Sequence, residues 1–128
     1  MPFNVDDSFI DVAESELHVR FPAAYRAAMR QRNGGVISTD DEDWELHPVA
    51  DSSDRKRLSR TLNSVVSETL AAKEWPGFPQ DAVAIANNGA GDLLVFLSTG
   101  ADLGPEVFVW RHETQDLNLV AADFSTLS

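Results

Sequence analysis

The chain has 128 residues, a length that suits one domain with a single hydrophobic core. It carries 21 acidic and 10 basic residues, and the resulting net charge of −11 disfavours nucleic acid and anionic membranes as partners while it favours a basic protein. The absence of cysteine excludes disulfides and thiolate metal sites, and because the chain has neither a signal-like N-terminus nor an apolar run near the ~20 residues of a membrane span, we expect a cytoplasmic protein.

The N-terminal part of the chain has the pattern of two short helices in succession. The first is predicted over residues 8–19, where Ser8 and Asp11 have the spacing of a capping box. The second is predicted over residues 22–32 and follows almost at once, so the two form a helical hairpin or corner. The apolar stripe of the first helix repeats at helical spacing and consists of Ile10, Ala13 and Leu17.

Both ends of the second helix are marked in the sequence. Pro22 stands at its start, where the fixed φ of proline suits a helix and the missing N–H costs little. Tyr25, Ala28 and Met29 lie on one face and predict its buried side. The segment Asn33-Gly34-Gly35 accepts positive φ, so it ends the helix and turns the chain.

A run of four acidic residues follows the short strand predicted at Val36-Ile37. The run is Asp40, Asp41, Glu42 and Asp43, and mutual repulsion places it in a turn. It lacks the alternating ligands and the glycine of a calcium-binding loop. Two interpretations have similar weight: a solvated turn, or one rim of a surface that meets a cationic protein. The next strand is predicted over residues 44–49, where apolar and polar residues alternate until Pro48 ends the pairing.

One long helix is predicted over residues 54–73, after several candidate N-caps. Its apolar stripe consists of Leu58, Leu62, Val65, Val66 and Leu70. Its polar face carries the only concentrated basic cluster of the sequence, Arg55, Lys56, Arg57 and Arg60. This cluster is too small and isolated for a groove that binds single-stranded nucleic acid.

The C-terminal half has the pattern of a meander. Apolar runs at residues 82–86, 93–97, 107–110 and 117–120 are separated by clusters of Gly, Asn, Asp or Pro. The spacers are too short for helical crossovers, which favours antiparallel pairing. The predicted fold class is therefore α+β, a single domain over residues 1–128. It has a mostly antiparallel sheet of about six short strands, with helices at about 8–19, 22–32 and 54–73 packed on one side.

The large aromatic residues divide into core and interface candidates. Tyr25 and Trp110 lie on faces that the pattern predicts to be buried. Trp44 stands beside the acidic run and Trp75 in a Pro-Gly loop, so both are candidates for partial exposure. An exposed tryptophan is a typical anchor of a protein interface.

No pattern in the chain indicates catalysis. The three histidines are far apart, and none belongs to a paired metal-binding motif. His112 with Glu113 and Asp116 has two interpretations, a metal or acid–base site or simply a turn after a strand, and the turn is favoured. Gly89-Ala90-Gly91 leads into a strand rather than a helix, so it predicts a hairpin turn and not a dinucleotide loop. We assign no catalytic, cofactor-binding or metal-ligating residue.

Several of these motifs occur together in one known family. Glu14, Leu17, Pro22, Tyr25 and the Asn33-Gly34-Gly35 segment are spaced as in the SUKH superfamily, the Smi/Knr-like domains, which the chain resembles. Residues 87–97, 104–113 and 123–127 look like the later blocks of the same family in the same order. His18 stands where the family commonly has glycine, and histidine is among the residues that tolerate a left-handed backbone. The resemblance implies a fold-determining role for Leu17, Pro22, Tyr25, Asn33, Gly34, Gly91, Asp92 and Trp110.

The resemblance also implies a function. Many bacterial members are non-enzymatic immunity proteins that neutralise a partner toxin, and the acidic composition suits a basic toxin domain that is blocked by occlusion. The alternative is a regulatory scaffold of the Smi/Knr cell-regulation type, with several weaker partners. Nothing in the sequence demands an oligomer. The residues expected at the partner surface are Asp40, Asp41, Glu42, Asp43 and Trp44, followed by Asp92, Asp102 and Glu113.

Overall fold

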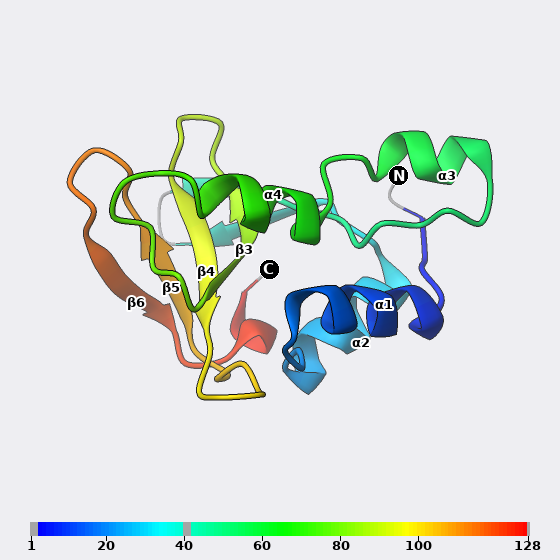
Figure 1. Ribbon diagram of the computed structural model, residues 1–128, viewed down its shortest axis with the longest axis horizontal. Coiled ribbons are helices and arrows are strands. Elements are labelled where there is room, and N and C mark those ends of the chain that lie inside the picture. The colour runs from blue at the N-terminus through cyan, green and yellow to red at the C-terminus, as the bar shows by residue number, and fades with distance from the viewer. Residues whose placement is uncertain (1–2, 40–41, 128) are drawn as a thin grey trace.

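The computed structural model describes residues 3–39 and 42–127, so Asp40 and Asp41 lie outside the described residues. Within these ranges the chain forms four α-helices, six strands and a closing 3₁₀ turn (Figure 1). The helices are α1 (Asp7–Leu17), α2 (Ala23–Gln31), α3 (Arg55–Arg60) and α4 (Val65–Ala72). The strands are β1 (Val36–Thr39), β2 (Glu42–Leu46), β3 (Ala82–Asn87), β4 (Leu93–Leu97), β5 (Val107–Trp110) and β6 (Leu117–Ala121), and the 3₁₀ turn is η1 (Phe124–Thr126).

The strands form one antiparallel sheet in the order β1-β2-β3-β4-β5-β6, which confirms the predicted α+β fold with an antiparallel meander. Because each strand pairs with the next one along the chain, the β1–β2, β3–β4 and β5–β6 turns all lie at one end of the sheet. We call this end the hairpin end; its described residues are 39, 42–43, 88–92 and 111–116. The connections β2–β3 and β4–β5 leave from the opposite end.

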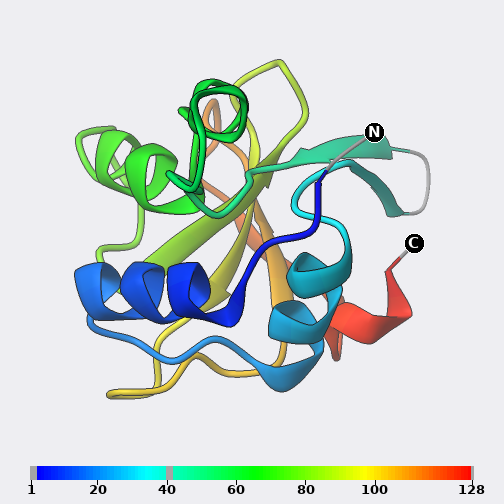
Figure 2. The same cartoon turned by 90° about the vertical axis from the view of Figure 1, so that its right-hand side faces the viewer.

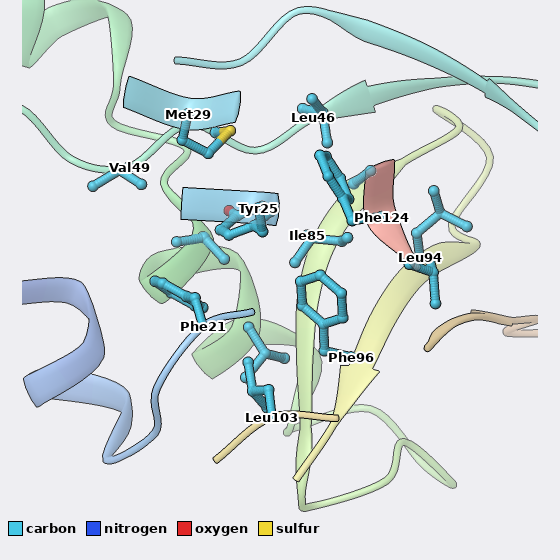
Figure 3. Packing of buried hydrophobic residues seen from close by; sticks show 14 of the residues in the cluster. Phe21, Tyr25, Met29, Leu46, Val49, Ile85, Leu94, Phe96, Leu103 and Phe124 are labelled. Carbon is cyan, nitrogen blue, oxygen red and sulfur yellow. The ribbon is translucent and has the colours of Figure 1, made fainter. Parts of the chain in front are cut away.

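The main hydrophobic core lies between one face of the sheet and α1, α2, the start of α4 and η1. Tyr25 of α2 is its centre, with ring centroids 5.0 Å from Phe21, 5.4 Å from Phe96 of β4 and 5.3 Å from Phe124 of η1 (Figure 3). Tyr25 and Met29 are both fully buried, as predicted from their helical spacing. In Figure 2 the C-terminal turn η1 lies beside α2, so the last element of the chain closes this core.

The α1–α2 corner is held by a carboxylate. Glu14 of α1 accepts the backbone N–H of Phe21 at 2.7 Å, and its other oxygen pairs with Arg26 of α2 at 2.8 Å. His18 ends α1 with φ of 59°, a left-handed conformation that histidine tolerates better than most residues. Two cap predictions are off by one or two residues: Asp6, not Ser8, caps α1, and Pro22 is the N-cap of α2 instead of its first residue.

Asn33 is a buried clamp between two segments of backbone. Its Nδ2 donates to the carbonyl of Val49 at 2.8 Å, and its Oδ1 accepts the N–H of Val49 at 2.7 Å. Gly34 follows with φ of 116°, so the chain turns directly into β1. The Asn-Gly pair therefore does more than end α2: it fastens the residues after β2 to the end of that helix.

The predicted helix over residues 54–73 is wrong as a single element, because it is two helices. Asp54 caps α3 and Ser64 caps α4, with their side chains accepting from Arg57 N and Ser67 N. Between the helices, Thr61 turns its hydroxyl inward to donate to Arg57 O at 2.9 Å and accept from Asp51 N at 3.0 Å. Because the helix is broken, the five residues of the predicted apolar stripe do not share one buried face. Val65 and Val66 are buried, but Leu58, Leu62 and Leu70 are exposed.

Helix α4 covers an edge that the sheet leaves open. Strand β2 pairs with β3 at only two positions, near Asn87, so the other half of β3 lacks a partner strand on that side. Thr69 of α4 accepts the N–H of Ala84 at 2.9 Å, and the ring of His47 contacts the carbonyl of Ala84 at 2.9 Å. Figure 1 shows α4 along β3, and α4 also contacts α1.

The second face of the sheet has its own small core, and α4 contributes to both cores, because its Val65 and Val66 belong to the main one. Ala72, at the end of α4, and Phe78 pack against Val95 and Trp110. The rings of Phe78 and Trp110 meet edge to face, with centroids 5.2 Å apart. This cover ends over β5 and leaves Leu117 and Leu119 of β6 exposed.

The basic cluster of α3 has a local explanation. Arg57 and Arg60 lie over the ring of Phe3, with 4.6 and 5.3 Å from guanidinium carbon to ring centroid. Arg57 also pairs with the buried Asp51 at 3.2 Å. These contacts fasten the N-terminal segment to α3.

Candidate partner-binding surface

The hairpin end gathers most of the acidic residues that the sequence singled out. The sequence of its three turns contains seven carboxylates and one arginine, and Glu42, Asp43, Asp92 and Glu113 lie here among the described residues. Asp102 does not: it lies in the β4–β5 connection at the opposite end, where it pairs with Arg20 at 2.8 Å. Four of the predicted carboxylates among the described residues therefore form one group, and Asp102 lies apart from them.

Arg111 is the centre of the hairpin end. Its guanidinium donates to both oxygens of Glu42, at 2.6 and 3.1 Å, and to Asp92 at 3.0 Å. Asn88 donates to the same two carboxylates at 3.1 and 3.2 Å. Side chains from all three turns thus meet in one network, and charge-assisted bonds of this kind are the stronger ones in proteins.

Asp92 is a structural anchor. Besides Arg111 and Asn88, it accepts the backbone N–H of His112 at 3.0 Å and contacts the Nδ1 of that ring at 2.8 Å. Burial alone would raise the pKa of Asp92, but hydrogen bonds from His112, Arg111 and Asn88 lower it to about 2. The pKa of Glu42 is also lowered, chiefly by its bond to Arg111. Both carboxylates are therefore charged at neutral pH and already bound within the molecule.

The carboxylates that remain free for a partner form the rim of this network. The side chain of Glu113 is 84% exposed, and Asp116 is exposed beside it. Asp43 is exposed on β2 and accepts the hydroxyl of Ser38 at 2.7 Å. The two groups have different roles: Glu42 and Asp92 position the turns, whereas Asp43, Glu113 and Asp116 present charge to solvent.

Trp44 corrects the sequence analysis, because it is buried instead of partly exposed. It lies on the inward face of β2 with 1% of its surface exposed, and its Nε1 donates to Thr39 at 2.7 Å. Arg111 lies over its ring at 5.8 Å. The ring of Trp44 thus packs beneath the guanidinium of Arg111 and is too buried to contact a partner. The other three aromatic predictions are confirmed: Tyr25 and Trp110 are buried and Trp75 is partly exposed.

A comparison of the sequence with protein-family models gave a match over nearly the whole chain. The model of the SMI1/KNR4 family (SUKH-1) matches residues 4–127. The chain belongs to the SMI1/KNR4 (SUKH-1) family. Comparisons with curated proteins and with solved structures gave no match.

The positions that carry the SUKH-1 resemblance occupy structural sites in this chain. Pro22 begins α2, Tyr25 is the centre of the core, and Asn33 clamps Val49. Asp92 anchors the hairpin end, and Trp110 lies in the second core. Leu17 packs against the main core, and Gly34 and Gly91 have positive φ. The inferred fold-determining role of this set stays a prediction, for which these placements give a physical basis.

Sequence reasoning missed Arg111 and Asn88, which hold the SUKH-1 hairpin end together. A signal was present, since Arg111 is the one basic residue among seven acidic ones in the three turns. It became meaningful only when the meander order placed those turns side by side. Paired histidine–carboxylate chemistry was considered for His112 with Glu113 and Asp116, but the nearest carboxylate to its ring is Asp92.

A groove of about 310 Å³ runs beside the hairpin end, between α4 and the β3–β4 turn. His47 lies at its base, with Nδ1 2.9 Å from the carbonyl of Ala84 and Nε2 3.0 Å from the amide nitrogen of Asn87. These contacts imply that Nδ1 carries the proton and that Nε2 accepts from Asn87. Burial lowers the pKa of His47, so the ring is neutral at pH 7. No group of three metal-ligating side chains occurs within residues 3–39 and 42–127, and no helix there is long and apolar enough to cross a membrane.

Proposed function

We propose that this SUKH-1 protein is a non-enzymatic immunity protein that binds a cognate bacterial toxin and blocks it by occlusion. The observation that carries the proposal is the hairpin end, where the sequence of three turns has an excess of carboxylates. Arg111 binds Glu42 and Asp92 there and so holds the turns together. A toxin domain that acts on phosphate-containing substrates is basic, so an acidic surface attracts it and covers its active site. Steering of this kind raises association rates about 10–10³-fold and weakens with salt.

The electrostatic arrangement supports this mechanism in two ways. Glu42 and Asp92 are paired internally, so the turns keep their shape without a partner. Glu113, whose carboxylate lies 4.0 Å from Nε2 of His112, and Asp116 are exposed and extend into solvent. A rigid, pre-arranged surface binds with less loss of conformational entropy than a mobile one.

The direct test is to mix the purified protein with the toxin encoded beside it and to measure association and dissociation at about 50 and 500 mM salt, where screening differs strongly. We expect tight binding with an association rate that falls steeply with salt. No binding at either concentration would contradict the immunity role for that pair. Several weak partners and no tight toxin would instead favour the regulatory-scaffold alternative.

A matched pair of variants locates the surface. Glu113→Lys removes a free carboxylate of the hairpin end, and we expect it to slow association about tenfold at low salt. Glu16→Lys makes the same change in net charge on an exposed position of α1, which lies away from the hairpin end. Equal effects of both variants would mean that only total charge matters and that the hairpin end is not the contact surface.

A further inference from the structure

The edge strand β6 is unusually open. Its first three residues, Leu117, Asn118 and Leu119, are all exposed, and the exposed fraction of Leu119 is 58%. Strand β1, the opposite edge, has the ordinary alternation of exposed and buried residues instead. β6 also contains no charge and no proline, the residues by which proteins usually protect a sheet edge from pairing.

The two leucines lie on the sheet face that Trp75 and Phe78 cover over β5 but leave uncovered over β6. Leu117 pairs with Trp110 and Leu119 with Phe108, so all four side chains point to the same face. Trp75 and Phe78 cover Trp110, with ring centroids at 6.0 and 5.2 Å. Phe108 is only partly buried, and beyond it the leucines of β6 are exposed. Figure 1 shows β6 as the outer strand of the sheet. A further strand at this edge would continue the sheet and let its side chains cover them.

The charges around β6 indicate the kind of strand. From residue 112 to residue 128 the sequence contains Glu113, Asp116 and Asp123 but no lysine or arginine. Antiparallel pairing of two copies through β6, centred on Leu119, would place Asp116 of each copy opposite Ala122 of the other, next to Asp123. It would bring two acidic flanks close together, whereas a cationic segment would bring opposite charges there, so a cationic segment is the better occupant.

We propose that the β6 edge binds an extended segment of a cationic protein, which adds a seventh strand to the sheet. Its backbone pairs with β6, its alternate apolar side chains cover Leu117 and Leu119, and flanking lysines or arginines meet Asp116 and Asp123. The positive charge expected of this partner rests on the proposed function, in which the partner is a basic toxin. The open edge and the uncovered leucines stand independently of it.

The test uses two synthetic peptides and the full chain. Each peptide has a central block of alternating valine and threonine; one has two lysines at each end and the other has two glutamates there. We expect the lysine peptide to shift the backbone amide NMR signals of residues 117–121 and to protect them from hydrogen exchange, with weaker binding at high salt. The glutamate peptide should produce neither effect.

Matched variants make the outcome decisive. Leu119→Lys should weaken binding of the lysine peptide by about tenfold or more, because it removes an apolar contact and adds a like charge. Leu62→Lys makes the same change at a leucine that is 66% exposed in the α3–α4 turn, and binding should be unchanged. Thermal unfolding of both variants checks that the fold is retained.

Three results would overturn the inference. They are amide shifts only outside β6, equal effects of both peptides, and a dimer of the wild-type chain that Leu119→Lys dissociates, which would assign the edge to a second copy. If the neighbouring toxin binds and Leu119→Lys leaves its affinity unchanged, the proposed function stands and the β6 inference fails. If the peptide binds β6 but no toxin binds, the β6 inference stands and the proposed function fails.

Discussion

Arg111 binds both carboxylate oxygens of Glu42, at 2.6 and 3.1 Å, and so joins the β5–β6 turn to the β1–β2 hairpin across 69 residues of sequence. Between these two turns lies the β3–β4 turn, which Arg111 also reaches through Asp92. The surface that we propose for partner binding therefore depends on one partly exposed cation that lies among the anions and holds them in place. A wholly acidic surface would repel itself and lose this geometry.

Removal of Arg111 tests this dependence. In Arg111→Met, Glu42 and Asp92 face each other without a cation, and we expect the free energy of unfolding to fall by roughly 1–3 kcal/mol. Urea denaturation at low and high salt measures the loss, which should shrink as salt screens the carboxylates.

The matched control for Arg111 is Arg20→Met. Arg20 pairs with Asp102 at 2.8 Å, but 74% and 58% of the two side chains are exposed. An exposed pair contributes less than about 1 kcal/mol, so this variant should be nearly neutral. If both variants lose the same stability, the Arg111 network does not hold the turns together.

A second prediction concerns the Asn33–Val49 clamp. Asn33→Ala leaves the N–H and the carbonyl of Val49 without partners in a buried position, and we expect a loss of roughly 2–4 kcal/mol in the free energy of unfolding. Asn63→Ala, at an exposed position of the α3–α4 turn, should stay within about 0.5 kcal/mol of the wild type. A small effect of Asn33→Ala would show that the turn after α2 holds without the clamp.

The sequence was sufficient for features that depend on near neighbours. The helical spacing of Tyr25 and Met29 identified their burial, and short spacers identified the antiparallel meander. The left-handed backbone at His18 is compatible with a local rule, since histidine is among the residues that tolerate it. In each case the signal and its structural consequence lie within one or two elements.

Other features failed because they depend on side-chain contacts outside the segment that carries the pattern. The long helix was expected because its apolar spacing continues through Leu62, but Thr61 forms hydrogen bonds with both Asp51 and Arg57 and breaks it. Trp44 was placed at the surface because of its acidic neighbours. The alternation of β2 turns its ring inward, where Thr39 accepts its N–H. No pattern within either segment reports such a partner.

The stability of the protein should fall as the pH drops below 6.5, because of His47. Burial lowers the pKa of His47 from its ordinary value of 6.5, while the bond to Ala84 and the charges of Glu68 and Glu45 act in the opposite direction. Below pH 6.5 the unfolded chain therefore binds a proton that the folded chain rejects. The free energy of unfolding then falls by up to about 1.4 kcal/mol per pH unit for this one group.

The measurement is urea denaturation between pH 8 and pH 5 for the wild type and for His47→Gln. The variant should be less stable at pH 8, because it loses the ring contacts, and its stability should vary less between pH 6.5 and 5. Parallel profiles for the two proteins would exclude His47 as the source of the pH dependence.

Asp92 controls a separate and more acidic window. Its pKa of about 2 is below the ordinary value of 3.8, so its stabilising contribution is complete above pH 4 and is lost as the pH falls from about 4 to about 2. Asp92→Asn should therefore be destabilised at pH 7 and should approach the wild type near pH 2. A constant difference over this range would mean that the charge of Asp92 contributes nothing.

Gly91 and Gly89 provide the sharpest test of how rigid the hairpin end is. Both have positive φ, 103° and 80°, so alanine at either position carries backbone strain of roughly 1–2 kcal/mol. They differ in their surroundings: a Cβ at Gly89 meets nothing within 4 Å, whereas one at Gly91 would lie 2.9 Å from Nδ1 of His112. Gly91→Ala must therefore displace the ring that contacts Asp92.

We expect Gly91→Ala to lose at least about 1 kcal/mol more than Gly89→Ala in the free energy of unfolding, since overpacking adds to the strain. The histidine NMR signals of His112 should shift in the first variant only. Equal losses with an unmoved ring would mean that the His112–Asp92 contact yields easily. In that case the turns would have to become ordered on binding, and association with a toxin would be slower and less sensitive to salt than a pre-arranged acidic surface requires.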